Sequence, residues 1–495
     1  MKEFLFNSRK FAVAVLAIGL LGLAACGGGN DAVDAALEDN QPPAPPPILA
    51  YIPEDPTPAD DEVETFVERE LDLEGRVITS ASWWDVMRGR GTGSQPPDPA
   101  TAVNYLVERM QWDNLRRVED KFNVSFDYII IPQGEVTPTL LSSVLAGDSL
   151  ADIWYLLGGQ NFSAINGDLL HSAGTFAPSD ADMLNAQRVM RPRNTLFGEI
   201  WNFSDTSPMV HGMGMGVNLD IINAIGAPNP VDLFNAGEWT WDAMREIMIM
   251  ATRDTTGDGT IDQFGISGQP HNIMINLIAA NDGHLVNPDT LTYGFGDPNT
   301  LTALEFIFDI FNTYNVWYYD STSGNPMGDW GRNTFSYRDG RSALFTTATW
   351  MLQYDDLPFE YAFVPYPLGP NSQNGFVRMY GFSSGYAMPV TTQNPQDILR
   401  VMEEVFSWAV DEPELITMSA LDYARPAWLT DDDVWRVIHV GDHVSTDIGM
   451  VIYGYYWVLG SFAHYFRNGY MTVSQAVEAF RPQQQEMIDA VFAGR

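Results

Sequence analysis

Strand-like and helix-like segments alternate in the first third of the sequence, and this alternation limits the fold more than any other feature. Residues 77–82, 123–131 and 151–157 are short runs rich in apolar side chains. The stretches between them, 101–122 and 137–147, carry apolar residues at helical spacing. Strands separated by helices form parallel βαβ units, so we predict an α/β fold.

The middle of the chain adds one well-marked helix and two further strands. Residues 238–252 predict a helix that Thr240 caps, and one face of it carries Trp241, Met244, Ile247, Met248 and Ala251. A short strand is expected at 264–267. Residues 209–216, "MVHGMGMG", predict an apolar strand with close backbone approach at its glycines, although a metal or haem role for His211 is an alternative.

The N-terminus has the features of a secretory signal. Basic residues precede an apolar run at 11–25, which is too short to span a membrane. The run ends at "LAAC", which resembles the lipobox of bacterial lipoproteins, and in that family the peptide is cut before the cysteine and the cysteine is acylated. Cys26 is the only cysteine of the chain. An ordinary signal peptide with an incidental cysteine is the alternative.

Composition divides the rest into a tether and a body. Residues 26–70 are dominated by Gly, Pro and acidic side chains, so we expect a flexible tether. The body is long enough for two or three domains. A formal net charge of -38 argues against a nucleic acid or an anionic surface as partner.

An acidic stretch, "DTTGDGTIDQFG", resembles an EF-hand calcium loop. Oxygen-bearing side chains alternate along it, and Gly259 stands at its sixth position, where such a loop turns sharply. Gly265 replaces the glutamate expected at position twelve. Calcium here would be structural, and a metal-free turn is the alternative; no other cofactor is required. The candidate ligands are Asp254, Thr256, Asp258, the Thr260 carbonyl and Asp262.

Aromatic residues at strand ends are the best candidates for ligand contacts. In an open α/β sheet, ligands bind outside the carboxyl ends of the strands, and aromatic faces suit the apolar faces of sugars. Core packing is the alternative for each residue taken alone. The candidates are Trp83, Trp84, Tyr155, Trp350, Tyr456 and Trp457.

Motifs for catalysis give little support to an enzyme. Residues 381–385 fit G-x-S-x-G, but the extended segment that follows favours a strand where a hydrolase needs a helix. Zinc-protease and P-loop motifs do not occur in the sequence. A pair of carboxylates for glycoside hydrolysis stays open, because Asp and Glu are abundant throughout.

An ordered series of short matches resembles the extracellular solute-binding proteins of bacterial ABC importers, of the sugar-binding group. The lipobox and tether are followed by "ITSASWWD", "LLSSVLAGDSLADIWYL", "GMGMGVNLDIINAIGAPNP", "EWTWDAMREIMIMAT", "YRDGRSALFTTATWML" and "YYWVLGSFAHYFRNGYMTVSQAVEAF". The resemblance covers essentially the whole body, although "GMGMG" stands where the family often has tyrosine.

The resemblance implies a periplasmic-binding-protein-like fold of type II, with hinge-connected lobes around a ligand cleft. It implies an N-terminal lobe of residues 71–212 plus 342–385 and a C-terminal lobe of 213–341 plus 386–495. By position, Trp350 and Tyr456 or Trp457 match residues that stack on sugars. Four further helices are expected, at residues 395–411, 413–422, 448–467 and 472–492.

The implied function is binding without catalysis. A monomer anchored outside the cell membrane through acylated Cys26 would capture a carbohydrate, close by hinge motion and deliver the ligand to ABC permease subunits. The alternatives are a lipid-anchored glycoside hydrolase, a surface adhesin or sensor-associated binder, and a binder of peptides or metals.

Overall fold

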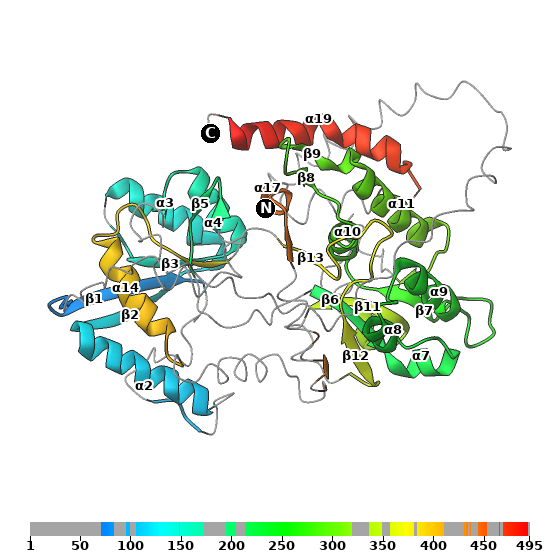
Figure 1. Ribbon diagram of the computed structural model, residues 1–495, viewed down its shortest axis with the longest axis horizontal. Helices are drawn as coiled ribbons and strands as arrows, with labels where there is room; N and C mark the ends of the chain where they lie inside the picture. The colour runs from blue at the N-terminus through cyan, green and yellow to red at the C-terminus, as the bar shows by residue number, and fades with distance from the viewer. Residues whose placement is uncertain are drawn as a thin grey trace, which may run out of the picture. The chain divides into compact units, whose positions relative to one another are not determined.

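A computed structural model describes the body in segments and shows two separate mixed sheets with flanking helices (Figure 1). The described residues are 71–83, 96–99, 105–147, 149–172, 195–203, 213–318, 336–348, 357–380, 384–409, 430, 432–433, 436, 444–452, 465 and 469–493.

The first sheet has the predicted βαβ order. Its strands lie in the order β14-β3-β1-β2, where β1 pairs in parallel with both β2 and β3, and β14 adds to β3 in the antiparallel direction. The bounds are β1 Arg76–Ser82, β2 Val124–Ile130, β3 Ile153–Leu156 and β14 Gly385–Ala387. The predicted strands and helices of this region are therefore confirmed. The helices are α2 Tyr105–Phe122, α3 Val136–Ala146, α4 Gly158–Asn166 and α14 Pro395–Phe406.

Helices α2 and α14 pack together over one face of this sheet. Their apolar side chains meet Ile78 of β1 in a buried cluster that includes Leu115 and Met402. The Asn114 amide donates to the Glu404 carbonyl at 2.9 Å and to the Val405 carbonyl at 3.1 Å. Segments almost 300 residues apart in sequence thus share one core.

The second sheet runs in the order β10-β7-β11-β6-β12. Strands β7, β10 and β11 are parallel, whereas β6 is antiparallel to both of its neighbours. The bounds are β6 Met213–Asn218, β7 Phe264–Ser267, β10 Trp317–Tyr318, β11 Ser342–Ala348 and β12 Tyr361–Val364. The helices that accompany it are α7 Leu219–Ile225, α8 Pro230–Ala236, α9 Trp241–Ala251, α10 Pro270–Ala279 and α11 Pro298–Asn312.

Sheet membership corrects the predicted lobe boundaries. Strands β11 and β12 belong to the second sheet with β6 and β7, so the expectation that residues 342–385 join the first lobe is wrong for these strands. The expectation that residues 386–495 join the second lobe is wrong for α14, which packs on α2. The chain passes from the second sheet back to the first after β12, which is later than predicted, because β11 and β12 both pair with β6.

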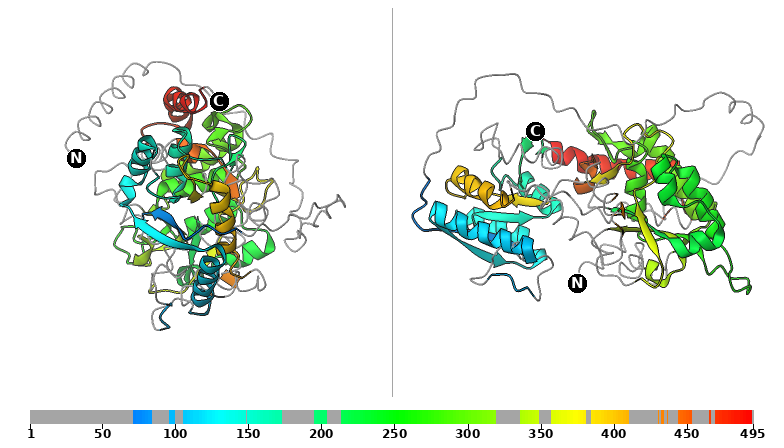
Figure 2. Two further views of the ribbon diagram at one scale, coloured as in Figure 1. Left: turned by 90° about the vertical axis from the view of Figure 1, so that its left-hand side faces the viewer. Right: turned by 60° about the horizontal axis from the view of Figure 1, so that its bottom comes forward.

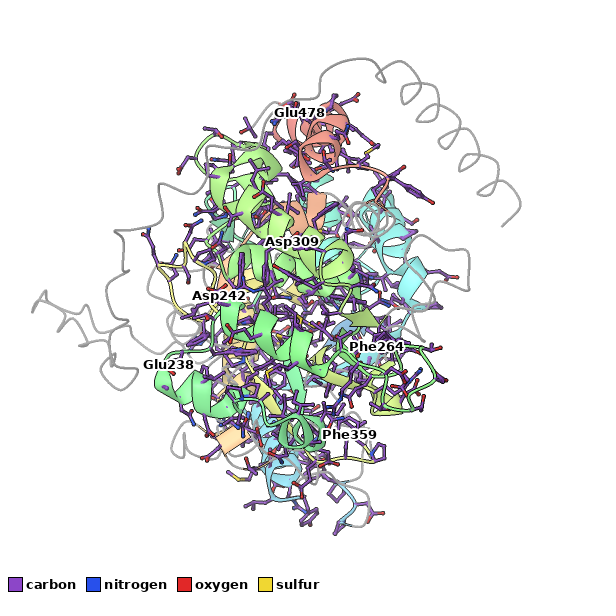
Figure 3. The ribbon with its side chains drawn as sticks, turned by 90° about the vertical axis from the view of Figure 1, so that its right-hand side faces the viewer. Glu238, Asp242, Phe264, Asp309, Phe359 and Glu478 are labelled. Atoms are coloured by element: carbon purple, nitrogen blue, oxygen red, sulfur yellow. The ribbon has the colours of Figure 1, made fainter. Side chains whose placement is uncertain are left out.

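Helix α9 follows its predicted pattern closely. The Thr240 hydroxyl accepts the Ala243 N–H at 3.4 Å, and the buried residues are the five that form the predicted face. Trp241 stacks on Phe306 of α11 with 4.7 Å between ring centroids. Figure 3 labels Asp242 in the first turn of α9 and Phe264 on the neighbouring strand β7.

Strand β6 confirms the predicted role of the glycines at 214 and 216. A Cβ on Gly214 would lie 2.2 Å from the Phe363 ring, and a Cβ on Gly216 would lie 2.0 Å from the Phe345 ring. Both rings are fully buried. The rings of β11 and β12 thus fill the space above β6, and His211 lies outside the described residues.

Further described elements are a C-terminal helix, a short helix before it and three small strand pairs. Helix α19, Val473–Phe492, is confirmed, and it contacts α11 and β9 (Figures 1 and 2). The predicted helix at 448–467 begins with α17, Gly449–Ile452, and the predicted helix at 413–422 lies outside the described residues. The described residues also form three small strand pairs: β4 Thr195–Leu196 with β5 Glu199–Ile200, β8 Val286–Asn287 with β9 Thr292–Tyr293, and β13 Arg378–Tyr380 with β15 Val444–Thr446. Among the described residues, none of the helices combines the length and apolarity that crossing a bilayer needs.

Candidate binding site

The carboxyl ends of the parallel strands are where a sheet of this kind binds ligands, and the second sheet carries a buried polar cluster there. Ser267 ends β7, and Gln269 and His271 follow at the start of α10. All three side chains are at least 98% buried. Thr346 and Thr347 stand at the same end of the adjacent strand β11 and are also buried. These five residues are the carboxyl-end cluster.

Gly268 shapes the turn from β7 into α10. Its φ is +116°, a conformation that residues with side chains rarely adopt, and a Cβ would lie 2.2 Å from the Thr346 methyl group. Pro270 then occupies the first turn of α10, where its missing N–H leaves no bond unmade. Glycine and proline thus hold Gln269 and His271 against the edge of the sheet.

The cluster offers hydrogen bonds without a formal charge. Burial lowers the pKa of His271 to about 3, so the imidazole is neutral near pH 7 and has one donor and one acceptor nitrogen. The Thr346 hydroxyl lies 2.6 Å from the Tyr366 hydroxyl. Burial raises the pKa of Tyr366, so its hydroxyl also stays protonated. Hydroxyl, amide and imidazole groups of this kind suit an uncharged ligand with many hydroxyls.

Trp83 has the predicted position at the carboxyl end of β1. It directly follows Ser82, the last residue of the strand, and is half-buried against the larger apolar core. Its role in ligand binding stays a prediction. Trp84, Trp350, Tyr456, Trp457 and Cys26 lie outside the described residues.

Tyr155 lies within β3, on the face that carries α2 and α14. Its ring meets Tyr386 of β14 edge-on, with 5.1 Å between centroids, and it packs against the cluster beneath these helices. This packing gives Tyr155 a structural role in the sheet. A contact between Tyr155 and a ligand stays a prediction.

The acidic loop at 254–262 is held by its own carboxylates. Asp254 accepts the N–H groups of Gly257 at 2.7 Å and of Gly259 at 2.6 Å, and these bonds hold its pKa below the usual range. Asp262 accepts both the N–H and the hydroxyl of Thr255. Within the described ranges, no three His, Cys, Asp or Glu side chains are grouped as a metal site requires. Calcium binding by Asp254, Thr256, Asp258, Thr260 and Asp262 stays a prediction.

The G-x-S-x-G motif does not lead into a helix. Its last glycine, Gly385, begins strand β14, so the strand–turn–helix geometry of a hydrolase elbow is not formed. The extended segment predicted there is confirmed.

Sequence reasoning missed the carboxyl-end cluster of the second sheet. It predicted the strand at 264–267 but assigned no role to the residues that follow it. The signal was present, because a parallel strand that ends in "S-G-Q-P-H" places polar side chains and a glycine turn where ligands bind.

Solved structures of substrate-binding proteins resemble this chain along most of its length. The cyclic alpha-maltosyl-1,6-maltose binding protein of Arthrobacter globiformis matches with a TM-score of 0.58 and 16% identity, covering 84% of this chain and 99% of its own. An ABC substrate-binding protein of Listeria monocytogenes in complex with cycloalternan matches with a TM-score of 0.56 and 14% identity, covering 85% and 100%.

A third match is the maltose/maltodextrin-binding domain of Bdellovibrio bacteriovorus bound to maltotriose, with a TM-score of 0.53, 12% identity and coverage of 84% and 99%. The chain has the fold of these substrate-binding proteins. The predicted α/β periplasmic-binding-protein-like fold is therefore confirmed. No protein-family model and no curated protein matches the sequence.

Proposed function

We propose that this chain is an extracytoplasmic solute-binding protein that captures a neutral carbohydrate of the oligosaccharide class and delivers it to an ABC permease. The carboxyl-end cluster of the second sheet carries the proposal, because it gathers uncharged hydrogen-bonding groups at the edge where this fold binds ligands. The structural neighbours are described as binders of maltotriose, cycloalternan and a cyclic maltosyl-maltose.

Neutral polar groups favour a sugar over a charged ligand. A peptide or metal ligand presents charge, and burying that charge without a partner is costly. Gln269 and neutral His271 can donate to and accept from hydroxyl groups without that cost. Trp83, at the carboxyl end of β1, supplies an aromatic face of the kind that stacks on sugar rings.

The proposed cellular location is based on the N-terminal segment of the sequence. Acylated Cys26 would anchor the protein at the outer face of the cell membrane, and residues 26–70 would hold the body away from it. The protein would work as a monomer. Import energy would come from a partner ATPase, since the sequence contains no P-loop motif.

A thermal-shift screen followed by calorimetry tests the proposal. Maltotriose, mannotriose and other neutral oligosaccharides should raise the melting temperature, because a ligand that binds only the native state stabilises it by mass action. Gln269→Ala should weaken binding about tenfold, as expected for one lost hydrogen bond to a buried polar group. Gln373→Ala, which changes an exposed side chain, is the matched control.

The screen also separates the rival functions. A shift with peptides and none with any carbohydrate would overturn the sugar proposal. Chromatography of the oligosaccharide after incubation would reveal cleavage products if the protein were a glycoside hydrolase. Unchanged affinity in Gln269→Ala would remove the carboxyl-end cluster from the binding site.

A further inference from the structure

Asp447 is a fully buried carboxylate that has no place in the proposed binding site. It lies between β15 and α17, and its side chain has no exposed surface. Its oxygens accept the N–H groups of Leu285 at 2.6 Å, Val286 at 3.3 Å and Gly449 at 2.8 Å. One side chain therefore ties the segment that enters β8 to the first residue of α17.

The charge of Asp447 has little compensation. His284 Nδ1 is 3.9 Å away, beyond hydrogen-bond distance, and a third of the His284 side chain is exposed to solvent. The strand and helix on either side, β15 and α17, carry no titratable side chain of their own. On α19, which packs against α17, Glu478 and Arg481 pair with each other at 2.8 Å. Among the described residues, His284 is thus the side chain that could offset the charge of Asp447, and it does so only when it is protonated.

The position of α17 makes this contact relevant to the rest of the molecule. Helix α17 contacts α19 and also α4, and α4 begins directly after β3 at the carboxyl end of the first sheet. A change in the stability of α17 would therefore affect its contact with α4, a helix that starts at a ligand-binding edge of the first sheet.

We propose that Asp447, with Leu285, Val286 and Gly449, forms a proton-controlled latch that holds α17 more firmly in mild acid than at neutral pH. In the latched state the ionised carboxylate is buried without a hydrogen-bonded cation, whereas opening exposes it to water. Protonation removes the cost of the buried charge, so acid favours the latched state. The latch does not depend on the proposed function. Any effect of the latch on ligand uptake, however, rests on the proposed function.

The direction follows from linkage. Burial raises the pKa of Asp447 from 3.8 to about 6. The stabilisation of the latched state is therefore fully present below pH 3.8 and is lost as the pH rises through about 6. Across this window the latch should tighten on the order of 100-fold.

Hydrogen exchange of the latch amides tests the proposal without a ligand. In the wild-type protein, the opening of Leu285, Val286 and Gly449, corrected for the intrinsic pH dependence of exchange, should become rarer by about 25-fold between pH 7.5 and pH 4.5. The amides of α9 serve as an internal reference. Asp289→Asn, an exposed change on the neighbouring loop, should keep this dependence, and Asp447→Asn should abolish it.

A flat wild-type profile would overturn the latch, and so would an unchanged slope in Asp447→Asn. The wild-type profile decides the question even where Asp447→Asn does not fold. Maltotriose affinity measured at both pH values then tests the link to uptake. A wild-type protein that binds no carbohydrate but shows the predicted exchange profile would refute the proposed function and leave the latch intact.

Discussion

Replacement of Gly216 by alanine should destabilise the second sheet strongly. The new Cβ would lie 2.0 Å from the Phe345 ring, which is 1.4 Å closer than the 3.4 Å at which ordinary contact begins. The ring cannot move aside easily, because it is fully buried and stacks on Tyr337 with 4.6 Å between centroids. Overpacking of a dense core costs about 1–3 kcal/mol, and we expect Gly216→Ala at the upper end of this range.

Urea unfolding followed by tryptophan fluorescence measures this loss as a lower midpoint at constant slope. Adding Phe345→Leu to Gly216→Ala should recover part of the stability, because the smaller side chain makes room for the methyl group. A double-mutant cycle between the two sites should therefore give a coupling of about 1 kcal/mol or more.

Gly159→Ala is the matched control, since a Cβ at Gly159 in α4 meets nothing within 4 Å. It should be neutral or stabilise the protein by up to about 1 kcal/mol, as alanine favours helices. A Gly216→Ala protein as stable as Gly159→Ala would refute the close packing of β6 against β11.

Arg436→Ala should lower the free energy of unfolding by about 3–5 kcal/mol, because it leaves the buried Asp433 carboxylate at the edge of β12 without its cationic partner. Arg245→Ala, which breaks an exposed ion pair on α9, should lower it by at most about 1 kcal/mol. Equal urea midpoints for the two variants would contradict this difference. His271→Gln should reduce the loss of stability in acid, because the depressed pKa of His271 makes the free energy of unfolding of the wild-type protein fall as the pH drops from 6.5 towards about 3. Equal slopes of unfolding free energy against pH in the two proteins would exclude His271 as the cause. Calcium added to chelator-treated protein should raise the melting temperature if the loop at 254–262 binds it, and Asp258→Asn should remove the rise; no rise at millimolar calcium would refute the calcium prediction.

Local features of the sequence predicted the individual elements well. Helix α9 was predictable because its cap, its apolar face and its length all agree, and tertiary packing did not have to override them. Strand β6 was predictable because alternate glycines in an apolar run indicate close approach of neighbouring side chains, which Phe345 and Phe363 provide.

The arrangement of elements and the polar cluster were harder to predict. The apolar pattern of β11 and β12 shows that they are buried strands but contains no information about which sheet they join. Ser267, Gln269 and His271 are chemically ordinary residues, and only their place after a parallel strand gives them meaning. Asp447 was hidden among many acidic residues, because its burial depends on β8, which lies about 160 residues earlier in the chain.

Two buried titratable residues act on stability in opposite directions, and this determines how the latch can be observed. Depression of the His271 pKa makes the folded state lose stability as the pH falls below 6.5, whereas elevation of the Asp447 pKa makes it gain stability as the pH falls below about 6. Between pH 6 and pH 3.8 the two contributions, each up to a few kcal/mol, partly cancel. A global melting curve would therefore show only a weak pH dependence there. Local exchange at the amides bound to Asp447 keeps the two effects apart, since His271 lies on α10 and donates to none of those three bonds.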